Sequence, residues 1–194
     1  MNRELDKYVR EWKSWSKGAS RMENGWQSDF TNWEDLIYYA KSAMTQEPDA
    51  ADLENIEFCW YISEESEELA DFAIDYMDKV WQVIEFLAQS QFVEVRIQVY
   101  KVLGEAGPRA EKILRHGLHD SDSYCRRIAI LSLSKLSVPD SGELALSFVY
   151  DVDPYTRQAS LQLAKAANNP KLESQVREIL LKDKVEHVRN AASA

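Results

Sequence analysis

The chain has 194 residues, of which 45% are hydrophobic and 29% charged, and its formal net charge is −10 at pH 7. This length can bury a sizeable core, and no run of about 18 apolar residues predicts a helix that crosses a membrane. The N-terminus, MNRELDKYVREW, is too charged for a secretory signal peptide, so we expect a soluble cytoplasmic protein with no membrane partner.

The first part of the chain is predicted to form three helices. Residues 2–17 place apolar side chains at helical spacing with charges between them. A polar, glycine-bearing connection follows, after which Asp29 or Thr31 can cap a second helix that runs to Met44. A third helix is expected to begin at Asp52 and to end before the serines of SEESEE.

Residues 67–87 are predicted to form one unbroken helix, the longest of the chain. Its apolar residues keep a period of 3.6, Tyr76 among them, and acids fill the outer face. Because this helix leads directly into a set of internal repeats, residues 1–88 are expected to be a diverged helical N-terminal cap that continues the same stack.

The negative charge is concentrated in one segment. Residues 49–86 contain twelve acids and a single base, Lys79, whereas residues 96–194 contain fifteen bases and twelve acids. Such a segment favours a basic protein partner and disfavours nucleic acid, although a solvated helix face explains the same run equally well. The residues expected to bind the partner, with Trp60 contributing if it is exposed, are Glu57, Trp60, Tyr61, Glu64, Glu65, Glu67, Glu68, Asp71, Asp75 and Asp78.

The second half of the chain repeats one pattern at a nearly fixed interval. Arg96, Arg126, Arg157 and Arg189 are separated by steps of 30, 31 and 32 residues, which is a period typical of repeat architectures. Around each arginine, small or apolar residues recur on one stripe of a predicted helix. Turns containing Gly or Pro introduce a second helix in three copies, predicted over residues 109–118, 143–150 and 171–182.

Aspartates precede the arginines in the pattern D-x-D-x-x-x-R. The second aspartate stands where an N-cap is expected, and an arginine repeated in register with an aspartate indicates an ion-pair ladder between repeats. His187 is expected to stand alone in a capping loop. The residues given this structural role are Asp120, Asp122, Arg126, Asp151, Asp153, Arg157, Asp183 and Arg189.

This pattern resembles the HEAT-repeat family, particularly the short bacterial form found in phycobilin lyase-type proteins. The resemblance covers Ser90 to Ala194, with copies at about 89–118, 119–150, 151–182 and a partial copy at 183–194. It implies an all-α fold, a right-handed α-solenoid of helix pairs, and a binding scaffold in place of an enzyme. In the first copy Ser90 and Phe92 stand in place of the two aspartates.

No motif predicts catalysis or a cofactor. The chain has no nucleophile elbow, phosphate-binding loop, dinucleotide fingerprint or C-x-x-C. His116 and His119 are close in sequence, but no further metal ligand accompanies them at a recognisable spacing. We therefore expect no enzymatic activity, no cofactor and no metal.

Three kinds of function remain open. The first is an immunity-type inhibitor that covers a basic, nuclease-like toxin surface with the acidic segment. The second is a general scaffold or adaptor, including a lyase-like chaperone. The third is a DNA glycosylase-like enzyme, which the acidic charge disfavours because such an enzyme needs a basic groove. A monomer is the expected state.

Overall fold

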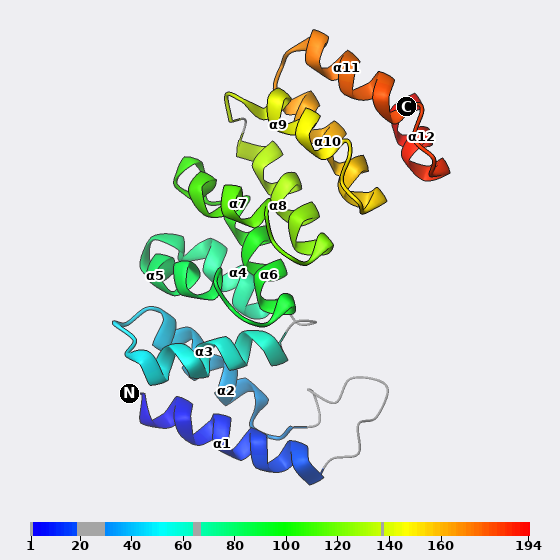
Figure 1. The fold of residues 1–194 in the computed structure, drawn as a ribbon. Coiled ribbons are helices and arrows are strands. Elements are labelled where there is room, and N and C mark those ends of the chain that lie inside the picture. The colour runs from blue at the N-terminus through cyan, green and yellow to red at the C-terminus, as the bar shows by residue number, and fades with distance from the viewer. Residues whose placement is uncertain (1, 19–29, 64–66, 137) are drawn as a thin grey trace. The chain divides into compact units, whose positions relative to one another are not determined.

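The computed structural model describes residues 2–18, 30–63, 67–136 and 138–194. Within these ranges it contains twelve α-helices, one short 3-10 helix and no strand (Figure 1), so the predicted all-α fold is confirmed. Contacts divide the chain into two units, Met1–Val99 and Tyr100–Ala194. The division falls inside helix α6 (Val93–Leu103).

The first unit is built from a cluster of helices that precedes α6. Helices α1, α2 and α3 pack against one another, α4 contacts α2, and α5 contacts α2, α3 and α4. Fully buried side chains from each helix fill the space between them, for example Leu36, Ile56 and Ile84. The helices are α1 (Arg3–Gly18), α2 (Trp33–Met44), α3 (Ala50–Ile62), α4 (Glu68–Asp75) and α5 (Met77–Leu87).

The prediction of one long helix over residues 67–87 is wrong. Tyr76 has φ −117° and ψ 27°, which ends α4 and precedes α5, and its ring packs on Phe72 with centroids 4.6 Å apart. No Gly or Pro marks this break, and the apolar period continues through it, so the sequence contains no signal for it. Tyr76, expected on the apolar stripe, is 44% exposed as a result.

The start of α2 also differs from its prediction. The N-cap is Asn32, which makes no side-chain capping hydrogen bond, so Thr31 does not cap the helix, and Asp29 lies outside the described residues. Helix α3 starts at Ala50, two residues earlier than expected. Asp49 and Asp52 form a reciprocal capping box there, which satisfies two backbone N–H groups at the helix start.

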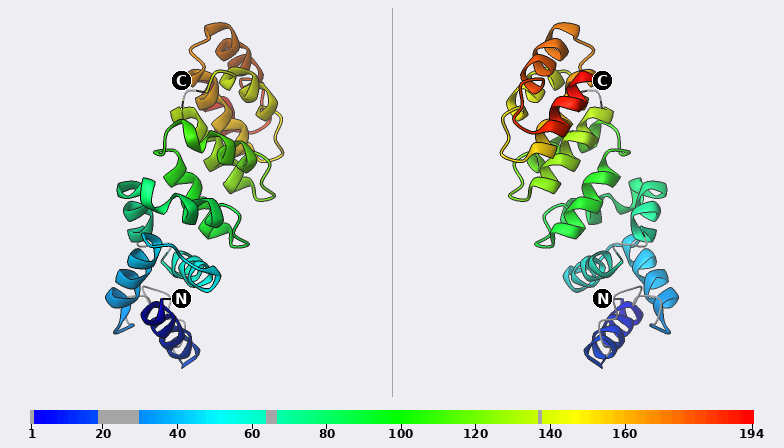
Figure 2. Two further views of the ribbon diagram at one scale, coloured as in Figure 1. Left: turned by 90° about the vertical axis from the view of Figure 1, so that its left-hand side faces the viewer. Right: turned by 90° about the vertical axis from the view of Figure 1, so that its right-hand side faces the viewer.

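The second unit is a two-layer stack of helix pairs. Helix α10 contacts α8 and α12 in one layer, and it contacts α9 and α11 in the other. The last helix, α12, lies against α10 and α11 (Figure 2). The second helices lie close to the predicted ranges. The elements are η1 (Pro108–Ala110), α7 (Glu111–Gly117), α8 (Ser123–Leu136), α9 (Ser141–Phe148), α10 (Pro154–Ala166), α11 (Pro170–Leu180) and α12 (Glu186–Ser193).

Small residues and caps explain why this stack forms. Ala129, Ser160 and Ala192 occupy the same position in three repeats, and each is at most 1% exposed, so neighbouring helices approach closely. Asp153 accepts hydrogen bonds from the backbone N–H and the hydroxyl of Thr156 at 2.6 and 2.9 Å. Asp122 likewise accepts from the backbone N–H of Cys125 at 3.0 Å, so both aspartates start helices.

Candidate interaction surfaces

Two of the repeated arginines link successive repeats through ion pairs with little exposure to solvent. Arg126 donates two hydrogen bonds to the carboxylate of Asp151 at 2.9 and 3.0 Å. Arg157 does the same to Asp183 at 2.6 and 2.8 Å. In the second pair the side chains are only 7% and 8% exposed. These arginines therefore hold repeats together, and their charges are occupied.

Each repeated arginine also fixes the loop that precedes its own helix. The four arginines donate to the carbonyl oxygen six residues earlier, at 2.7 to 3.0 Å. The first aspartate of a repeat accepts from the backbone N–H two residues later, as Asp120 does from Asp122 at 2.9 Å. Ser90 makes the same contact through its hydroxyl, which accepts from Phe92 N–H at 3.1 Å. Serine thus replaces aspartate in the first copy without loss of the loop geometry.

The ion pairs lower the pKa of both carboxyl groups. The hydrogen bonds from Arg157 lower the pKa of Asp183 to about 2, although burial alone would raise it. Burial raises the pKa of Asp151, but the hydrogen bonds from Arg126 and from the backbone N–H of Asp153 outweigh it, so the pKa falls below its usual value. Both carboxylates therefore stabilise the fold in their charged form.

The stability of the second unit should consequently fall in acid. The pKa of Asp183 is about 2 in the folded protein and 3.8 in the unfolded chain. The stabilisation that this carboxylate contributes is therefore complete above the unfolded pKa, and it is lost as the pH falls from there through the folded pKa. Between about pH 5 and about pH 3 we expect the wild type to lose about 1 kcal/mol more unfolding free energy than Asp183→Asn. Urea titrations at both pH values measure this difference, and equal losses would show that Asp183 is not the group responsible.

The acids expected to bind a partner are placed unequally. Glu67, Asp71, Asp75 and Asp78 are exposed, and we call these four residues the acidic face. Glu57 and Glu68 are half-buried, and Lys41 lies 3.4 Å from Glu68, which offsets part of the charge of Glu68. Glu64 and Glu65 lie outside the described residues.

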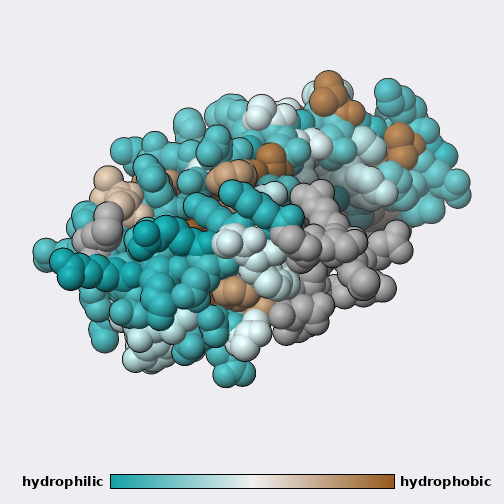
Figure 3. Space-filling view, turned by 90° about the horizontal axis from the view of Figure 1, so that it is seen from below, coloured by the Kyte–Doolittle hydropathy of each residue, from teal (hydrophilic) through white to brown (hydrophobic). Residues whose placement is uncertain are grey.

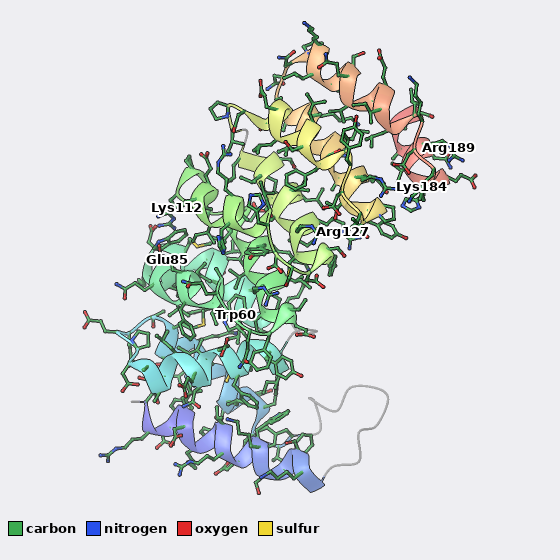
Figure 4. The ribbon with its side chains drawn as sticks, in the orientation of Figure 1. Trp60, Glu85, Lys112, Arg127, Lys184 and Arg189 are labelled. Carbon is green, nitrogen blue, oxygen red and sulfur yellow. The ribbon has the colours of Figure 1, made fainter. Side chains whose placement is uncertain are left out.

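Trp60 does not belong to the binding surface. Its side chain is fully buried inside the first unit (Figure 4), and its backbone carbonyl accepts a hydrogen bond from Gln98 at 3.1 Å. The neighbouring Tyr61 is 38% exposed and stacks on Phe92 with ring centroids 4.5 Å apart. A helix places adjacent residues about 100° apart, so Trp60 can be buried while its neighbour Tyr61 is partly exposed.

Helix α4 carries the centre of the acidic face. Its inner side buries Leu69, Ala70 and Ala73, so Asp71 and Asp75, one turn apart, point outward. Neither of these two carboxylates has an ion-pair partner among the residues that the structure describes. Two exposed apolar side chains lie beside them in the sequence, since Ile74 is 40% and Tyr76 44% exposed. Neither was predicted to contact a partner.

The exposed side of helix α1 is polar. Helix α1 turns Leu5, Val9 and Trp12 inward, and the view from below shows a mostly hydrophilic surface with scattered apolar side chains (Figure 3). Isolated apolar residues of this kind are normal on a protein surface and indicate no docking site.

The described part of the chain offers no obvious reaction centre. No three His, Cys, Asp or Glu side chains in it are grouped so that they could hold a metal ion. His116 lies in the last turn of α7 and His119 just beyond it. Burial raises the pKa of Cys59 to about 12, so its thiol is unreactive at neutral pH. None of the described helices combines the length and apolar character that crossing a membrane requires.

Comparison with known proteins agrees with the repeat pattern. Residues 82–163 match the family model for HEAT repeats, a range that includes α6 to α9 and most of α10. A search of the curated proteins gave no match. HEAT repeats support a role in protein–protein interaction, because stacked helix pairs present extended surfaces.

Proposed function

We propose that this HEAT-repeat chain is a protein-binding module that captures a basic protein surface on its acidic face. The observation that carries this proposal is the pair of outward carboxylates, Asp71 and Asp75, which no cation neutralises among the described residues. Unpaired charges of one sign attract a partner of opposite sign over several ångströms and speed its association. Ile74 and Tyr76 beside them supply apolar anchor area, which binding hot spots require.

The finer form of this proposal is an immunity-type inhibitor of a basic toxin. An enzyme that acts on nucleic acid needs a cationic surface to bind phosphates, and an acidic protein competes for that surface. An adaptor would use the same contacts without blocking an activity. Whether the captured partner loses its activity in the complex distinguishes the two roles.

The test compares two variants that carry the same net charge. In the first, Asp71 and Asp75 are replaced by lysine. In the second, two exposed acids elsewhere, Glu47 and Glu143, are replaced by lysine, so the total charge changes equally. Each protein is used to retain partners from the native cell.

We expect the wild type and the Glu47/Glu143 control to retain the same basic protein and the Asp71/Asp75 variant to lose it. Retention of that protein by all three would exclude the acidic face as the binding surface. Equal loss in both variants would show that only the net charge matters. Matching thermal transitions of the three proteins exclude misfolding as the cause.

A further inference from the structure

A second surface lies on the other unit, where an aromatic column crosses three repeats. Tyr124, Tyr155 and His187 each stand two residues before a repeated arginine, near the start of α8, α10 and α12. Because the repeats stack in register, equivalent positions become neighbours. His187 therefore does not stand alone in a loop, as its sequence position suggested, but lies in α12.

The column is joined into one continuous stack by Arg127. Its guanidinium carbon lies 4.2 Å from the ring centroid of Tyr124 and 5.3 Å from that of Tyr155. Tyr155 in turn stacks on His187, with centroids 4.5 Å apart and planes 21° apart. Cation–π contacts and ring stacking of this kind hold side chains in one orientation before a ligand arrives. We call Tyr124, Arg127, Tyr155 and His187 the aromatic column.

The surface around the column is exposed and hollowed. Tyr124 is 40%, Tyr155 51% and Val152 88% exposed. A groove of about 870 Å³ adjoins the loops that precede α10 and α12 and is not lined by the column itself. Its lining includes Tyr150, Val152, Lys182 and Lys184, together with Glu178 and the ion-paired Asp151 and Asp183. Apolar area beside a concave surface can bind an extended segment of another chain.

Arg127 of the column and two cations close to it in the sequence, Lys184 and Arg189, have no carboxylate partner within ion-pair distance among the described residues. They lie along one side of the second unit, away from Lys112 (Figure 4). The guanidinium of Arg127 lies against both rings, and no described residue accepts a hydrogen bond from it. Its N–H groups are therefore available to a carboxylate, which guanidinium binds in a two-point arrangement.

From this juxtaposition we propose that the aromatic column and the adjoining groove are a docking surface for an acidic, extended segment of a partner protein. Carboxylates of that segment bind Arg127 and Lys184, and apolar residues between them lie on Tyr155 and Val152. A continuous phosphate chain fits less well, because its evenly spaced charges cannot avoid Asp122, Asp153 and Glu186 at the same helix starts, whereas a peptide can place neutral residues beside these acids. This surface has the opposite charge preference from the acidic face and lies on the other unit, so it would bind a second partner or a second region of one partner.

The test uses fluorescence anisotropy with a short labelled peptide made of glutamate, leucine and serine. A matched peptide has glutamine in place of each glutamate, and a short single-stranded DNA serves as the phosphate probe. The protein variants are Arg127→Gln, Tyr155→Ala and the control Lys112→Gln, which removes an exposed cation elsewhere on the same unit. Thermal transitions verify that each variant is folded.

We expect the acidic peptide to bind at least about tenfold more tightly than the glutamine peptide. Arg127→Gln and Tyr155→Ala should each weaken it by about tenfold, while Lys112→Gln has no effect. Reversal of Asp71 and Asp75 should not weaken it, so this surface and the acidic face can fail independently. Three results would overturn the proposal. The protein could bind the two peptides with equal affinity, Arg127→Gln and Lys112→Gln could weaken binding of the acidic peptide equally, or the DNA could bind more tightly than the acidic peptide.

Discussion

Replacement of Arg157 by alanine is expected to lower the free energy of unfolding by about 3 kcal/mol. The substitution leaves the carboxylate of Asp183, 8% exposed, without its counter-charge. It also removes hydrogen bonds to the carbonyl oxygens of Asp151 and Val152 at 2.9 and 3.2 Å. A buried charge that loses its counter-charge costs much more than a surface pair does, because water cannot replace the lost contact.

The matched control for this prediction is Lys135→Ala. Lys135 pairs with Glu105 across the same stack of repeats, but the two side chains are 56% and 47% exposed, so its loss should cost less than about 1 kcal/mol. Urea unfolding of the two variants measures the difference. Similar losses in both would mean that the ladder of arginines contributes no more than ordinary surface pairs.

Replacement of Gly117 by valine is expected to lower the free energy of unfolding by about 2 kcal/mol. A Cβ at this position would lie 2.9 Å from Cζ of Tyr100 and 3.0 Å from Cβ of Ala129. Both neighbours are fully packed in the second unit, with Tyr100 1% exposed, so neither can move aside without disturbing its own contacts.

His116→Val serves as the control because the same side chain is then placed on the exposed side of the same helix. We expect that change to cost less than about 1 kcal/mol, mainly from helix propensity. Thermal and denaturant unfolding of the two variants report the comparison. If Gly117→Val were as stable as His116→Val, α7 would not pack as closely as the structure indicates.

The fold of the second unit could be predicted because its signals are local and repeated. The arginine period, the capping aspartates and the small-residue stripe each recur at equivalent positions, so each copy supports the interpretation of the others. Even the departure at Ser90 follows the rule, since its hydroxyl makes the contact that an aspartate makes elsewhere.

The first unit was less predictable because its features depend on packing. The apolar period runs through the break at Tyr76, and nothing in the sequence reports that Trp60 turns inward while Tyr61 turns outward. Composition could locate the acidic segment, but it could not reveal that Ile74 and Tyr76 lie exposed beside the acids.

The aromatic column shows a different limit. The adjacent Arg126 and Arg127 look alike in the sequence, although only Arg126 keeps the repeat interval. The structure separates them, because Arg126 binds Asp151 of the next repeat, whereas the guanidinium of Arg127 lies against the rings of Tyr124 and Tyr155. The shared position of Tyr124, Tyr155 and His187 relative to the repeated arginines was the available signal.

The most direct test of the central claim is the association rate constant with the captured basic partner, measured at low and at high salt. We expect the Asp71→Lys, Asp75→Lys variant to associate about tenfold more slowly than the Glu47→Lys, Glu143→Lys control at low salt. Added salt should slow the wild type and reduce this difference, because screening acts within about 8 Å at physiological ionic strength. Equal rate constants for the two variants, with no dependence on salt, would contradict capture by the acidic face.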